Sequence, residues 1–405
     1  MNKDNYIWIL GGGVMQLPMV WEAHHRGYKV LLSDRNKNCT CANIVEHFFA
    51  LDVFDSEVHI AQAQSMSIKP SAIVVDAIDC GVTGAILADH YGLPTCGYIA
   101  ALNAHDKVKM REALQAPHPT YLSLPIGTST EDARKWWTSK ANSEGIGIYP
   151  CVVKSSDNCA SRGITVVKGV DDWERAISSA TTNNRHSKFI LVEECLSGDE
   201  VATDWFISND DVVYANGAKR VFGDFGIEMG HTNPFTPTPV MVKQVSDAAR
   251  ALGVKYGPFK VDFIHDPYYG WVILETACRL SGGFDHTHTC PLATGKDVVG
   301  SVLDMALGLP LNRYKLQPRW DKHAACYAPR FKEGKIKGWR GLVVIRVSEG
   351  VEHAIALGGN VISPLLTCAD RPIFVITKGN SEAEAWSNAT RASEWIEPIY
   401  EVSNE

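Results

Sequence analysis

The sequence predicts a mixed α/β and α+β protein organised in three parts. In residues 1–102, apolar runs of strand length alternate with helical stretches, a pattern that indicates a parallel, doubly wound sheet. In residues 103–320, several strand-like runs follow one another directly, which favours antiparallel pairs. Residues 321–405 contain short strand-like runs and one late helix, so we expect a small third lobe there.

The first part is expected to alternate strand and helix from its start. A buried strand is followed by a glycine turn and a helix, and the same order then repeats. The expected elements are a strand at 6–10, a helix at about 14–26, a strand at 29–33, a strand at 71–77, a helix near 83–91 and a short strand before Gly97.

The glycine turn raises the question of a dinucleotide site. Three glycines, residues 11–13, follow the first strand, and Asp34 comes about 20 residues later, as in G-x-G-x-x-G nucleotide-binding turns. Gln16 stands where the third glycine of that motif belongs. We therefore favour a Rossmann-like turn without a cofactor over an NAD site. The simplest alternative is a tight turn that needs glycine only for its backbone freedom.

The two later parts are expected to mix helices with short strands. A helix capped by Asn103 should open the central part, and an acid-bearing hairpin should lie near its end. The central elements are a helix at 103–116, strands at 149–154, 164–168, 188–196, 201–207 and 211–218, helices at 171–180 and 241–252, hairpin strands at 259–265 and 271–277, and a helix at 296–307. In the third part we expect strands at 323–329, 342–347 and 373–379 and a helix near 381–396.

The composition is that of a well-packed globular protein. Of the 405 residues, 45% are hydrophobic and 21% are charged, and the formal net charge is −7. This charge gives no general attraction to nucleic acid or to an anionic membrane. No apolar run approaches the roughly 18 residues of a membrane span, and the first apolar run is too short for a signal peptide. The 11 cysteines, without a repeated spacing, are expected to be reduced thiols of a cytoplasmic protein.

The hairpin near the end of the central part carries two carboxylates. With the turn at the centre of its loop, Asp262 faces Glu275, and alternation puts Lys260, Ala277 and Arg279 on the same face. Facing carboxylates repel each other, so a cation is expected between them. A hard divalent ion, Mg²⁺ or Mn²⁺, fits oxygen ligands best. The alternative is neutralisation by Lys260 or Arg279 without a metal.

The second strand of this hairpin resembles a motif of the ATP-grasp superfamily. These enzymes carry an acid on one strand and E-x-N-x-R on the other, and here residues 275–279 read E-T-A-C-R. Because Ala277 replaces the asparagine, the motif is closer to the E-S-A-A-R of the bacilysin-type L-amino acid ligases. The resemblance implies an ATP-grasp fold with a Rossmann-like N-terminal lobe, central ATP-binding lobes and a small C-terminal lobe. It also implies that Asp262 and Glu275 hold Mg²⁺ between nucleotide phosphates, and that Arg279 binds phosphoryl and carboxyl oxygens.

The same resemblance assigns nucleotide contacts upstream of the hairpin. Lys107 in HDKVKMREAL and Lys154 at the end of YPCVVK match the two lysines that should contact nucleotide phosphates. The loop 155–163 would cover the phosphates with backbone N–H groups and hydroxyls, although it has fewer glycines than the loops of the family. Its candidate contacts are Ser161, Arg162 and Gly163.

The run FILVEECLSGDE resembles the adenine-binding strand and hinge of the family. Glu193 and the backbone from Glu194 to Leu196 would meet the adenine edge, and Glu200 would reach the ribose or its neighbourhood. Without the resemblance, Glu193 and Glu194 would be interpreted as a pair of acids at a strand end.

Two further segments carry candidate catalytic and substrate groups. E-x-x-H followed by N-P in residues 222–235 resembles a stretch of the L-amino acid ligases, which implies positions near metal and substrate for Glu228 and His231. The alternative is a solvated loop glutamate and histidine. The candidate substrate contacts are Lys260, Ser281, Gly282, Gly283, His286 and His288. In an extended chain His286, His288 and Cys290 would share one side, so a zinc ion there is a further alternative, beside plain structural roles.

The order of these features along the chain favours an ATP-dependent ligase. Such an enzyme uses ATP and Mg²⁺ (or Mn²⁺) to join a carboxylate, of an amino acid or a derivative, to an amine through an acyl phosphate, and it releases ADP and phosphate. The expected partners are these small molecules, with a homodimer as an assembly common in the resembled family. The alternatives are another ATP-grasp reaction of the carboxylase or purine-pathway type, an NAD-dependent oxidoreductase, and a non-catalytic nucleotide-binding protein.

Overall fold

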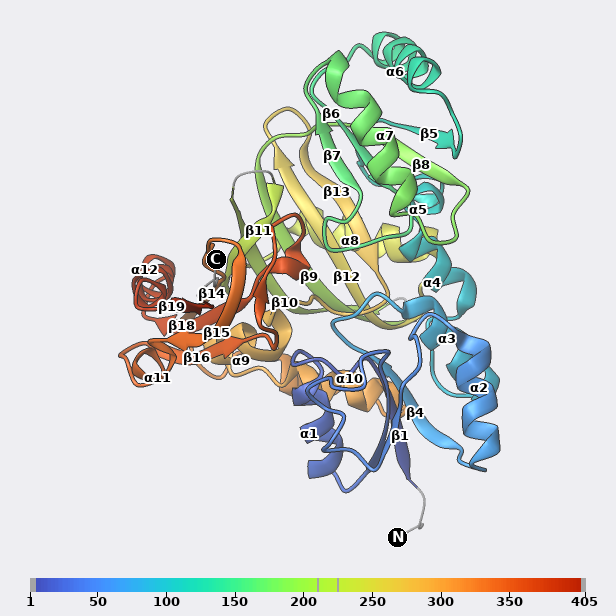
Figure 1. Ribbon diagram of the computed structural model, residues 1–405. Coiled ribbons are helices and arrows are strands. Elements are labelled where there is room, and N and C mark those ends of the chain that lie inside the picture. The colour runs from blue at the N-terminus through green and yellow to red at the C-terminus, as the bar shows by residue number, and fades with distance from the viewer. Residues whose placement is uncertain (1–4, 210, 224–225, 402–405) are drawn as a thin grey trace.

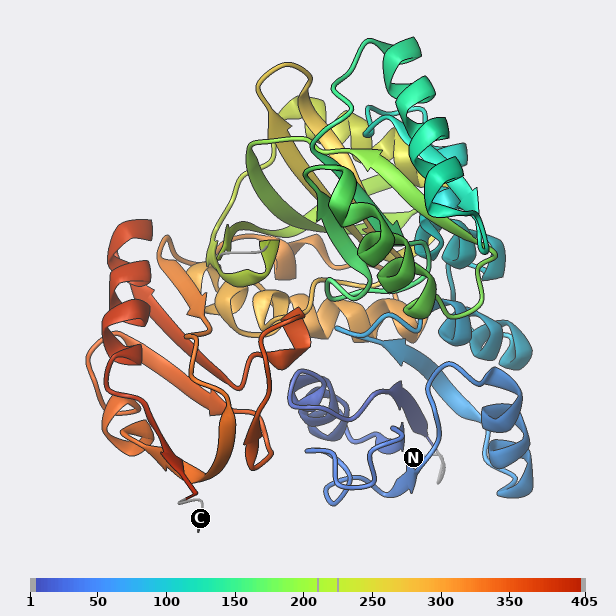
Figure 2. The same ribbon diagram turned by 45° about the horizontal axis from the view of Figure 1, so that its top comes forward.

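The protein folds into three lobes that meet at one central place. The computed structural model describes residues 5–209, 211–223 and 226–401. Figure 1 shows the N-terminal lobe in blue, an upper lobe in green and the C-terminal lobe in orange and red. The turned view in Figure 2 shows the same three lobes around the same junction. Within the described ranges, no helix is both long enough and apolar enough to cross a membrane.

The N-terminal lobe is built on a parallel sheet, as predicted. Its strands lie in the order β3-β2-β1-β4, and every neighbouring pair is parallel. The short strand predicted before Gly97 is wrong, because the segment contains Pro94, which has no N–H for a sheet, and runs irregularly into the next helix. The elements are β1 (Tyr6–Leu10), α1 (Leu17–His25), β2 (Lys29–Ser33), β3 (His47–Phe49), α2 (Ser56–Ser65), β4 (Pro70–Val75) and α3 (Gly81–Tyr91).

The glycine turn after β1 is closed by side chains of its own lobe. The backbone N–H of Gly12 donates to Asp34 Oδ2 at 2.8 Å, and that of Gly13 donates to Gln16 Oε1 at 3.0 Å. Gln16 Nε2 in turn donates to the carbonyl of Asp76 at 2.7 Å. These bonds take up N–H groups that a pyrophosphate would need, so they favour the interpretation of a turn without NAD.

A break at Asp106 sets the position of Lys107. The prediction of one helix over 103–116, capped by Asn103, is wrong, because Asp106 is extended and divides the segment into two helices. The Asp106 carboxylate accepts hydrogen bonds from two backbone N–H groups of the second helix, at 2.9 and 3.3 Å, and so caps it. Lys107 is therefore the first residue of a helix. The two helices are α4 (Tyr98–His105) and α5 (Lys107–Ala113).

A second sheet, of four antiparallel strands, forms the upper lobe. The strand order is β5-β8-β6-β7. Two helices pack on one face, where Trp137 and Trp173 fill the core. Because side chains alternate along a strand, Lys154 and Glu193 lie on the opposite face. The elements are β5 (Tyr121–Pro125), α6 (Thr130–Glu144), β6 (Cys151–Ser155), β7 (Ile164–Val167), α7 (Trp173–Thr182) and β8 (Phe189–Glu194).

An eight-stranded antiparallel sheet joins the central part to the C-terminal lobe. Its order is β13-β12-β9-β10-β11-β14-β18-β16, so it runs across the boundary predicted at 320/321. The division into three parts stays a prediction. The elements up to β14 are β9 (Asp199–Ser208), β10 (Asp211–Phe222), β11 (Glu228–Asn233), α8 (Pro239–Leu252), β12 (Tyr256–Asp266), β13 (Gly270–Ala277), the π-helical turn η3 (Asp285–Thr289), α9 (Cys290–Thr294), α10 (Val298–Ala306), η4 (Arg313–Leu316) and β14 (His323–Tyr327).

The C-terminal lobe adds a three-stranded sheet, ordered β17-β15-β19. The strand predicted at 342–347 is wrong, because the chain there forms a helical turn. Gly341 starts this turn with a φ of +87°, and a Cβ at that position would lie 1.8 Å from the carbonyl O of Trp395. The elements are β15 (Gly334–Arg340), α11 (Leu342–Ile345), β16 (Val351–Ala356), β17 (Val361–Ile362), η5 (Cys368–Asp370), β18 (Ile373–Gly379), α12 (Glu382–Ser393) and β19 (Glu397–Tyr400).

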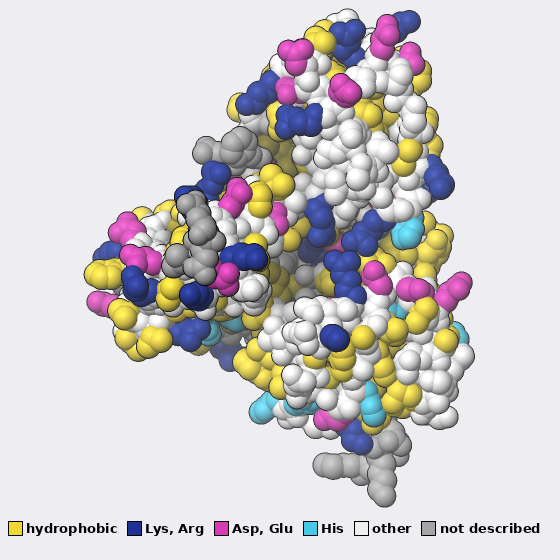
Figure 3. All heavy atoms as spheres, in the orientation of Figure 1, with side chains coloured by type: hydrophobic (Ala, Val, Ile, Leu, Met, Phe, Trp, Pro, Cys, Tyr) yellow, Lys and Arg dark blue, Asp and Glu magenta, His cyan; other side chains and the backbone are white. Residues whose placement is uncertain are grey.

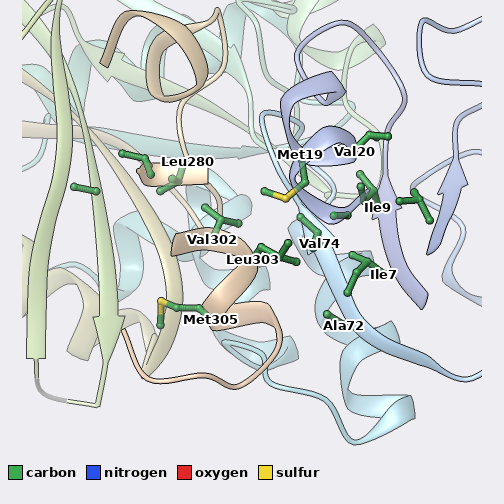
Figure 4. Packing of buried hydrophobic residues seen from close by; sticks show 14 of the residues in the cluster. Ile7, Ile9, Met19, Val20, Ala72, Val74, Leu280, Val302, Leu303 and Met305 are labelled. Atoms are coloured by element: carbon green, nitrogen blue, oxygen red, sulfur yellow. The ribbon is translucent and has the colours of Figure 1, made fainter. Parts of the chain in front are cut away.

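Helix α10 of the central part packs against the sheet of the N-terminal lobe. Figure 4 shows Val302 and Leu303 of α10 in one apolar cluster with Ile9 of β1 and Val74 of β4. Leu280, in the loop after β13, belongs to the same cluster. This contact holds the loop after the acid hairpin against the carboxyl ends of the parallel strands, where open sheets of this kind bind ligands.

Candidate active site

The hairpin of β12 and β13 has the predicted register. Asp262 lies opposite Glu275, and Lys260 lies opposite Ala277. Cations from different parts of the chain neutralise the two carboxylates. Lys260 forms an ion pair with Asp262, and the Nζ of the buried Lys107 lies 3.0 Å from Glu275 Oε1. Neutralisation of Asp262 by Lys260, one of the predicted alternatives, is thus observed. Lys107 neutralises Glu275, and this contact could not be predicted from the hairpin sequence.

The carboxylate of Glu275 is ionised at neutral pH. Burial would raise its pKa, but Lys107 and then Lys260 outweigh burial and bring the pKa of Glu275 to about 2. Burial would lower the pKa of Lys107, but Glu275 holds that pKa above its ordinary value. The pair therefore keeps both charges, and an ionised carboxylate is what a hard cation requires.

The donors at the hairpin fit a hard divalent cation. Asp262 Oδ1 is buried and has no hydrogen-bond partner, so one carboxylate oxygen is left for a further cation. Together with Glu275 across the strands, it offers the oxygen ligands that Mg²⁺ prefers. In the part of the chain that the structure describes, no cluster of three or more His, Cys, Asp or Glu side chains could hold a metal by itself. This agrees with a Mg²⁺ ion that takes its remaining ligands from phosphates and water.

Arg220 on β10 joins three acids that the sequence assigns to different roles. Its guanidinium nitrogens lie 3.1 Å from Asp262 Oδ2, 3.7 Å from Glu228 Oε2 and 3.9 Å from Glu200 Oε2. Burial raises the pKa of Glu200 to about 7, although Arg220 opposes the shift. Arg220 was not predicted from the sequence, because it belongs to no motif. The three acids surround it only because β9, β10, β11 and β12 pair in one sheet.

A buried group of three charges links the upper lobe to helix α5. Glu193 on β8 lies between Lys154 Nζ at 2.5 Å and Arg111 Nε at 2.9 Å. Arg111 also donates to the carbonyl O of Leu274 on β13 at 2.6 Å. The two cations take up the Glu193 carboxylate, and its contact with adenine stays a prediction. Arg111 was not predicted as a site residue. The only feature of the sequence that points to it is its place in the helix that begins with Lys107.

The loop 155–163 is tied to Lys107 and to the loop after α7. Lys107 Nζ donates to the carbonyl O of Asn158 at 2.7 Å. The Asp157 carboxylate accepts hydrogen bonds from the backbone N–H groups of residues 185–187, at 2.6 to 2.8 Å. The predicted covering loop is therefore held by the lysine beside the acid hairpin and by a second loop of the same lobe.

The tip of this covering loop has an unusual backbone. Ala160 and Ser161 have φ values of +57° and +62°, and Gly163 has +73°. Arg162 folds back within the loop, where its Nε donates to Asn158 Oδ1 at 3.0 Å. The nucleotide contacts of Ser161, Arg162 and Gly163 stay predictions.

Glu194 and Leu196 lie where β8 turns toward β9. The backbone N–H of Glu194 donates to the carbonyl of Thr120 at 2.8 Å, and its carboxylate accepts from the Tyr269 hydroxyl at 3.3 Å. Glu200 follows on β9 and is half-buried beside Arg220. The structure thus places these residues at the hinge between the two sheets, and their adenine and ribose contacts stay predictions.

Arg279 is held by the N-terminal lobe. Two of its guanidinium nitrogens lie 2.9 and 2.8 Å from Asp79 Oδ1, in the loop after β4, and a third donates to the carbonyl of Leu280 at 2.9 Å. Burial would raise the pKa of Asp79, but Arg279 outweighs it and holds that pKa far below its ordinary value. Arg279 is therefore fixed and charged, and its partner Asp79 was not predicted from the sequence.

Basic side chains gather where the three lobes meet. Figure 3 shows a hollow at this junction with Lys and Arg side chains around it. The cations described above that belong to the site are Lys107, Arg111, Lys154, Arg220, Lys260 and Arg279. Such a concentration of positive charge attracts a polyanionic ligand.

Glu228 and His231 lie side by side on β11. His231 Nδ1 is 3.5 Å from Glu228 Oε1, and His231 Nε2 is 3.0 Å from Thr289 Oγ1. Burial would raise the pKa of Glu228, but Arg220 outweighs it, with His231 adding to the effect, and the pKa lies far below its ordinary value. An ionised carboxylate beside an imidazole is an arrangement that can accept a proton. Residues 224–225 of the same predicted segment lie outside the described residues.

The segment after the hairpin is helical rather than extended. Because η3 is a π-helical turn, His286, His288 and Cys290 do not share one side. His286 Nε2 lies 2.8 Å from Asp76 Oδ1, whereas the His288 ring packs edge-on against His353. The zinc alternative is therefore wrong, and these three side chains form no metal cluster among the residues described.

The turn Ser281-Gly282-Gly283 is anchored on both sides. The backbone N–H and the hydroxyl of Ser281 donate to Asp204 Oδ1 at 2.8 and 2.9 Å. The N–H of Gly283 lies 3.3 Å from the Met15 sulfur in the N-terminal lobe. The structure thus gives this turn a role in joining lobes, and its substrate contacts, with those of Lys260, His286 and His288, stay predictions.

His286 makes the folded state sensitive to alkaline pH. Burial would lower its pKa, but Asp76 and then Asp204 raise it to about 9. Because the folded pKa lies above the unfolded value of about 6.5, the charged His286 stabilises the fold fully below pH ~6.5, and this contribution is lost as the pH rises through about 9. We expect the free energy of unfolding to fall by about 3 kcal/mol over this window.

Denaturant titrations at several pH values measure this loss. In the variant His286→Gln the fall between pH 6.5 and 9.5 should be much smaller, because glutamine keeps a polar side chain but does not titrate. An equal fall in both proteins would show that another group is responsible.

Comparison with known proteins agrees with this geometry. Residues 148–287 match the family model described as an ATP-grasp domain, a span that contains Lys154, the hinge and the acid hairpin. The chain has the ATP-grasp fold. Among solved structures, this chain is similar to an L-amino acid ligase from Bacillus licheniformis, with a TM-score of 0.78 and 19% identity over 99% of this chain and 100% of that one. The predicted fold is thereby confirmed.

The chain is also similar to two curated proteins whose names describe different activities. It is 24% identical over 329 residues to carnosine synthase 1 of Gallus gallus, and 24% identical over 267 residues to a formate-dependent phosphoribosylglycinamide formyltransferase of Pyrococcus horikoshii. These matches cover 75% and 61% of this chain but only 35% and 59% of the two relatives. ADP-forming ATP-grasp ligases are the enzyme class that the matches support, as predicted.

A further solved structure carries a nucleotide. The biotin carboxylase domain of 2-oxoglutarate carboxylase from Hydrogenobacter thermophilus was solved as a dimer with MgADP, ADP and bicarbonate. Its TM-score to this chain is 0.73 at 14% identity, over 97% of this chain and 90% of that one. At this level of identity, the similarity shows a shared fold.

Proposed function

We propose that this ATP-grasp protein is an ATP-dependent ligase that joins the carboxylate of an amino acid, or of a derivative, to an amine. The observation that carries the proposal is the hairpin on which Asp262 faces Glu275, with Lys107 on one acid and Arg220 on the other. The likeness to an L-amino acid ligase and to carnosine synthase 1 supports an amino-acid carboxylate.

The first step is phosphoryl transfer. A carboxylate oxygen of the substrate attacks the γ-phosphorus of ATP, the bond from that phosphorus to the β-phosphate oxygen breaks, and an acyl phosphate and ADP result. Such a step asks the protein for position and neutralised charge. Lys107 and Lys154 would hold the phosphates. Asp262 and Glu275 would hold Mg²⁺ (or Mn²⁺), which would supply positive charge to neutralise the phosphoryl group when bound.

The second step is attack by the amine on the acyl carbon, with loss of phosphate. Arg279, kept in place by Asp79, would stabilise the oxyanion of the tetrahedral intermediate. The amine must be neutral to attack, and the pair of His231 and Glu228 is the proposed acceptor of its proton. The loop 155–163 would keep water from the acyl phosphate, while Glu194, Leu196 and Glu200 would meet the adenosine.

Product analysis tests the proposal. We expect ADP and phosphate to appear only when ATP and Mg²⁺ are supplied together with an amino-acid pool, and mass spectrometry should detect the amide. Hydroxylamine in place of the amine should trap a hydroxamate, because it captures an acyl phosphate. Release of AMP and pyrophosphate would overturn the acyl-phosphate mechanism, and amino-acid-independent ADP release would remove the proposed substrate class.

A carboxylation is the second candidate, because the chain resembles a biotin carboxylase domain solved with bicarbonate. ADP release that depends on bicarbonate and needs no amino acid would favour it. The dimer in that solved structure also supports the proposal of a homodimer for this chain, which light scattering of the purified protein tests.

A further inference from the structure

The C-terminal lobe reaches the covering loop through the turn 366–371, here named the bridging turn. The backbone N–H of Cys368 donates to the carbonyl O of Ala160 at 3.2 Å, and the Cys368 sulfur lies 3.4 Å from Ser161 Oγ. In Figure 2 the orange-red chain of this lobe extends toward the centre of the molecule. Two residues of the loop proposed to cover the nucleotide are thus contacted by a lobe that is remote in sequence.

The two contacted residues are those with the strained backbone. Ala160 and Ser161 are consecutive and both have positive φ, a region that residues with a Cβ adopt at a cost of about 1 kcal/mol or more each. Such conformations persist only when the surroundings hold them. The hydrogen bond from Cys368 comes from outside the loop and supplies such a restraint.

Arg371 ties the same turn to the proposed proton acceptor. Its Nε donates to the carbonyl of Cys368 at 2.7 Å, and one of its terminal nitrogens donates to the carbonyl of Glu228 at 2.8 Å. The side chain is 7% exposed and lies over the Phe374 ring. One buried guanidinium therefore connects the bridging turn to the strand that carries Glu228 and His231.

The bridging turn is itself rigid. Asp370 Oδ2 accepts hydrogen bonds from the backbone N–H and the hydroxyl of Thr367, at 2.7 Å each, and Thr367 Oγ1 accepts from the N–H of Ala369 at 3.3 Å. This reciprocal cap fixes the turn. A displacement at one of its ends is therefore transmitted to the other.

We propose that Arg371 is a positioning residue that, through the bridging turn, couples closure of the covering loop to the placement of Glu228. When the turn is seated, the loop tip and Glu228 take their places together, so the acyl phosphate is enclosed while the proton acceptor is in position. The chemical consequence rests on the proposed function, but the coupling between turn, loop and strand does not.

Hydrogen exchange tests the coupling without any substrate. In Arg371→Met, we expect the amides at the tip of the loop, residues 159–162, to exchange about tenfold faster or more, because the tip loses the restraint that the bridging turn supplies. The matched control is Arg346→Met, which removes an arginine that donates to the carbonyl of Ala354 in the same lobe, at 3.2 and 2.9 Å. Exchange in the loop should not change in this control. Equal acceleration in both variants, or none in Arg371→Met, would overturn the proposal.

A second pair of variants isolates one hydrogen bond. Cys368→Pro removes only the N–H that reaches Ala160 and the thiol, because Cys368 is the first residue of η5 and Thr367 before it is already extended, both compatible with proline. Cys368→Ser removes the thiol and keeps the N–H. Loop exchange should accelerate in the proline variant alone. Acceleration in the serine variant as well, or in neither, would contradict a role for the hydrogen bond.

The ratio of amide formed to ADP released distinguishes this coupling from a purely structural role of Arg371, which would not change the ratio. In Arg371→Met and Cys368→Pro, the amount of amide formed per ADP released should fall about tenfold or more, because water reaches the acyl phosphate. Arg371→Lys, which keeps one donor, should restore part of the ratio. An unchanged ratio would overturn the coupling to chemistry. If loop exchange behaves as expected and no amide forms in any variant or in the natural protein, then the proposed ligase function is wrong and the coupling stands.

Discussion

Replacing Glu275 by glutamine is expected to lower kcat/KM for amide formation about a thousandfold or more, the scale set by removal of a charged group from a phosphoryl-transfer site. The fold should survive, because the Glu275 side chain is 35% exposed and Lys107 keeps its hydrogen bond to the carbonyl of Asn158. The change removes the negative charge that faces Asp262 and so weakens the proposed Mg²⁺ site.

Steady-state kinetics with ADP detection measure this effect, and the Mg²⁺ concentration for half-maximal rate should rise in the same variant. The control is Glu112→Gln, which changes an exposed acid of helix α5 and should leave both quantities unchanged. A Glu275→Gln enzyme with a near-normal rate at the usual Mg²⁺ concentration would refute the assignment of the hairpin as the reaction centre. The companion variant Arg279→Ala should lose turnover on a similar scale.

Replacing Glu193 by glutamine is expected to destabilise the protein by about 3–5 kcal/mol, because it leaves two buried cations without their counter-charge. Lys154, Arg111 and Glu193 are all nearly inaccessible to solvent, and both cations contact the one carboxylate. Burial would raise the pKa of Glu193, but Arg111 and then Lys154 outweigh it and lower that pKa. The contribution of this carboxylate is therefore fully present above the unfolded pKa and is lost as the pH falls from there through the lowered folded pKa.

The matched control is Glu144→Gln at the exposed end of helix α6. Glu144 also pairs with a lysine, since Lys140 Nζ lies 2.8 Å from it, but exposed pairs of this kind contribute only about 0.3–0.5 kcal/mol. Urea titration of both variants compares the two environments. If Glu193→Gln lowered the free energy of unfolding as little as Glu144→Gln does, the buried cations would have found other partners.

The hairpin was predictable because its information is local. A short turn fixes which residues face each other, and the period of two along a strand then places Asp262 against Glu275 without any tertiary knowledge. The parallel N-terminal sheet followed from the same kind of signal, the alternation of apolar strands and helices. The predicted helix at 103–116 failed because one capping residue, Asp106, outweighed helix propensity.

The partners of the site charges were not predictable, because they come from distant parts of the chain. Arg279 pairs with Asp79, which is 200 residues away in sequence, and Arg371 donates to Glu228 across 143 residues. A charged residue in a sequence shows that a partner is required when it is buried. Which residue supplies it depends on how the lobes pack, and no local pattern carries that information.

The pairing of Arg279 with Asp79 limits how the protein can be recombined with its relatives. A chimaera that joined residues 103–405 to the first lobe of another protein would leave the Arg279 guanidinium, which is only 12% exposed, without its carboxylate, and an unpaired charge with little access to water is costly. Exchange of the first lobe would therefore succeed only with donors that carry an acid after their fourth strand. When lobes of this protein are exchanged, Asp79 and Arg279 therefore have to be kept or replaced together.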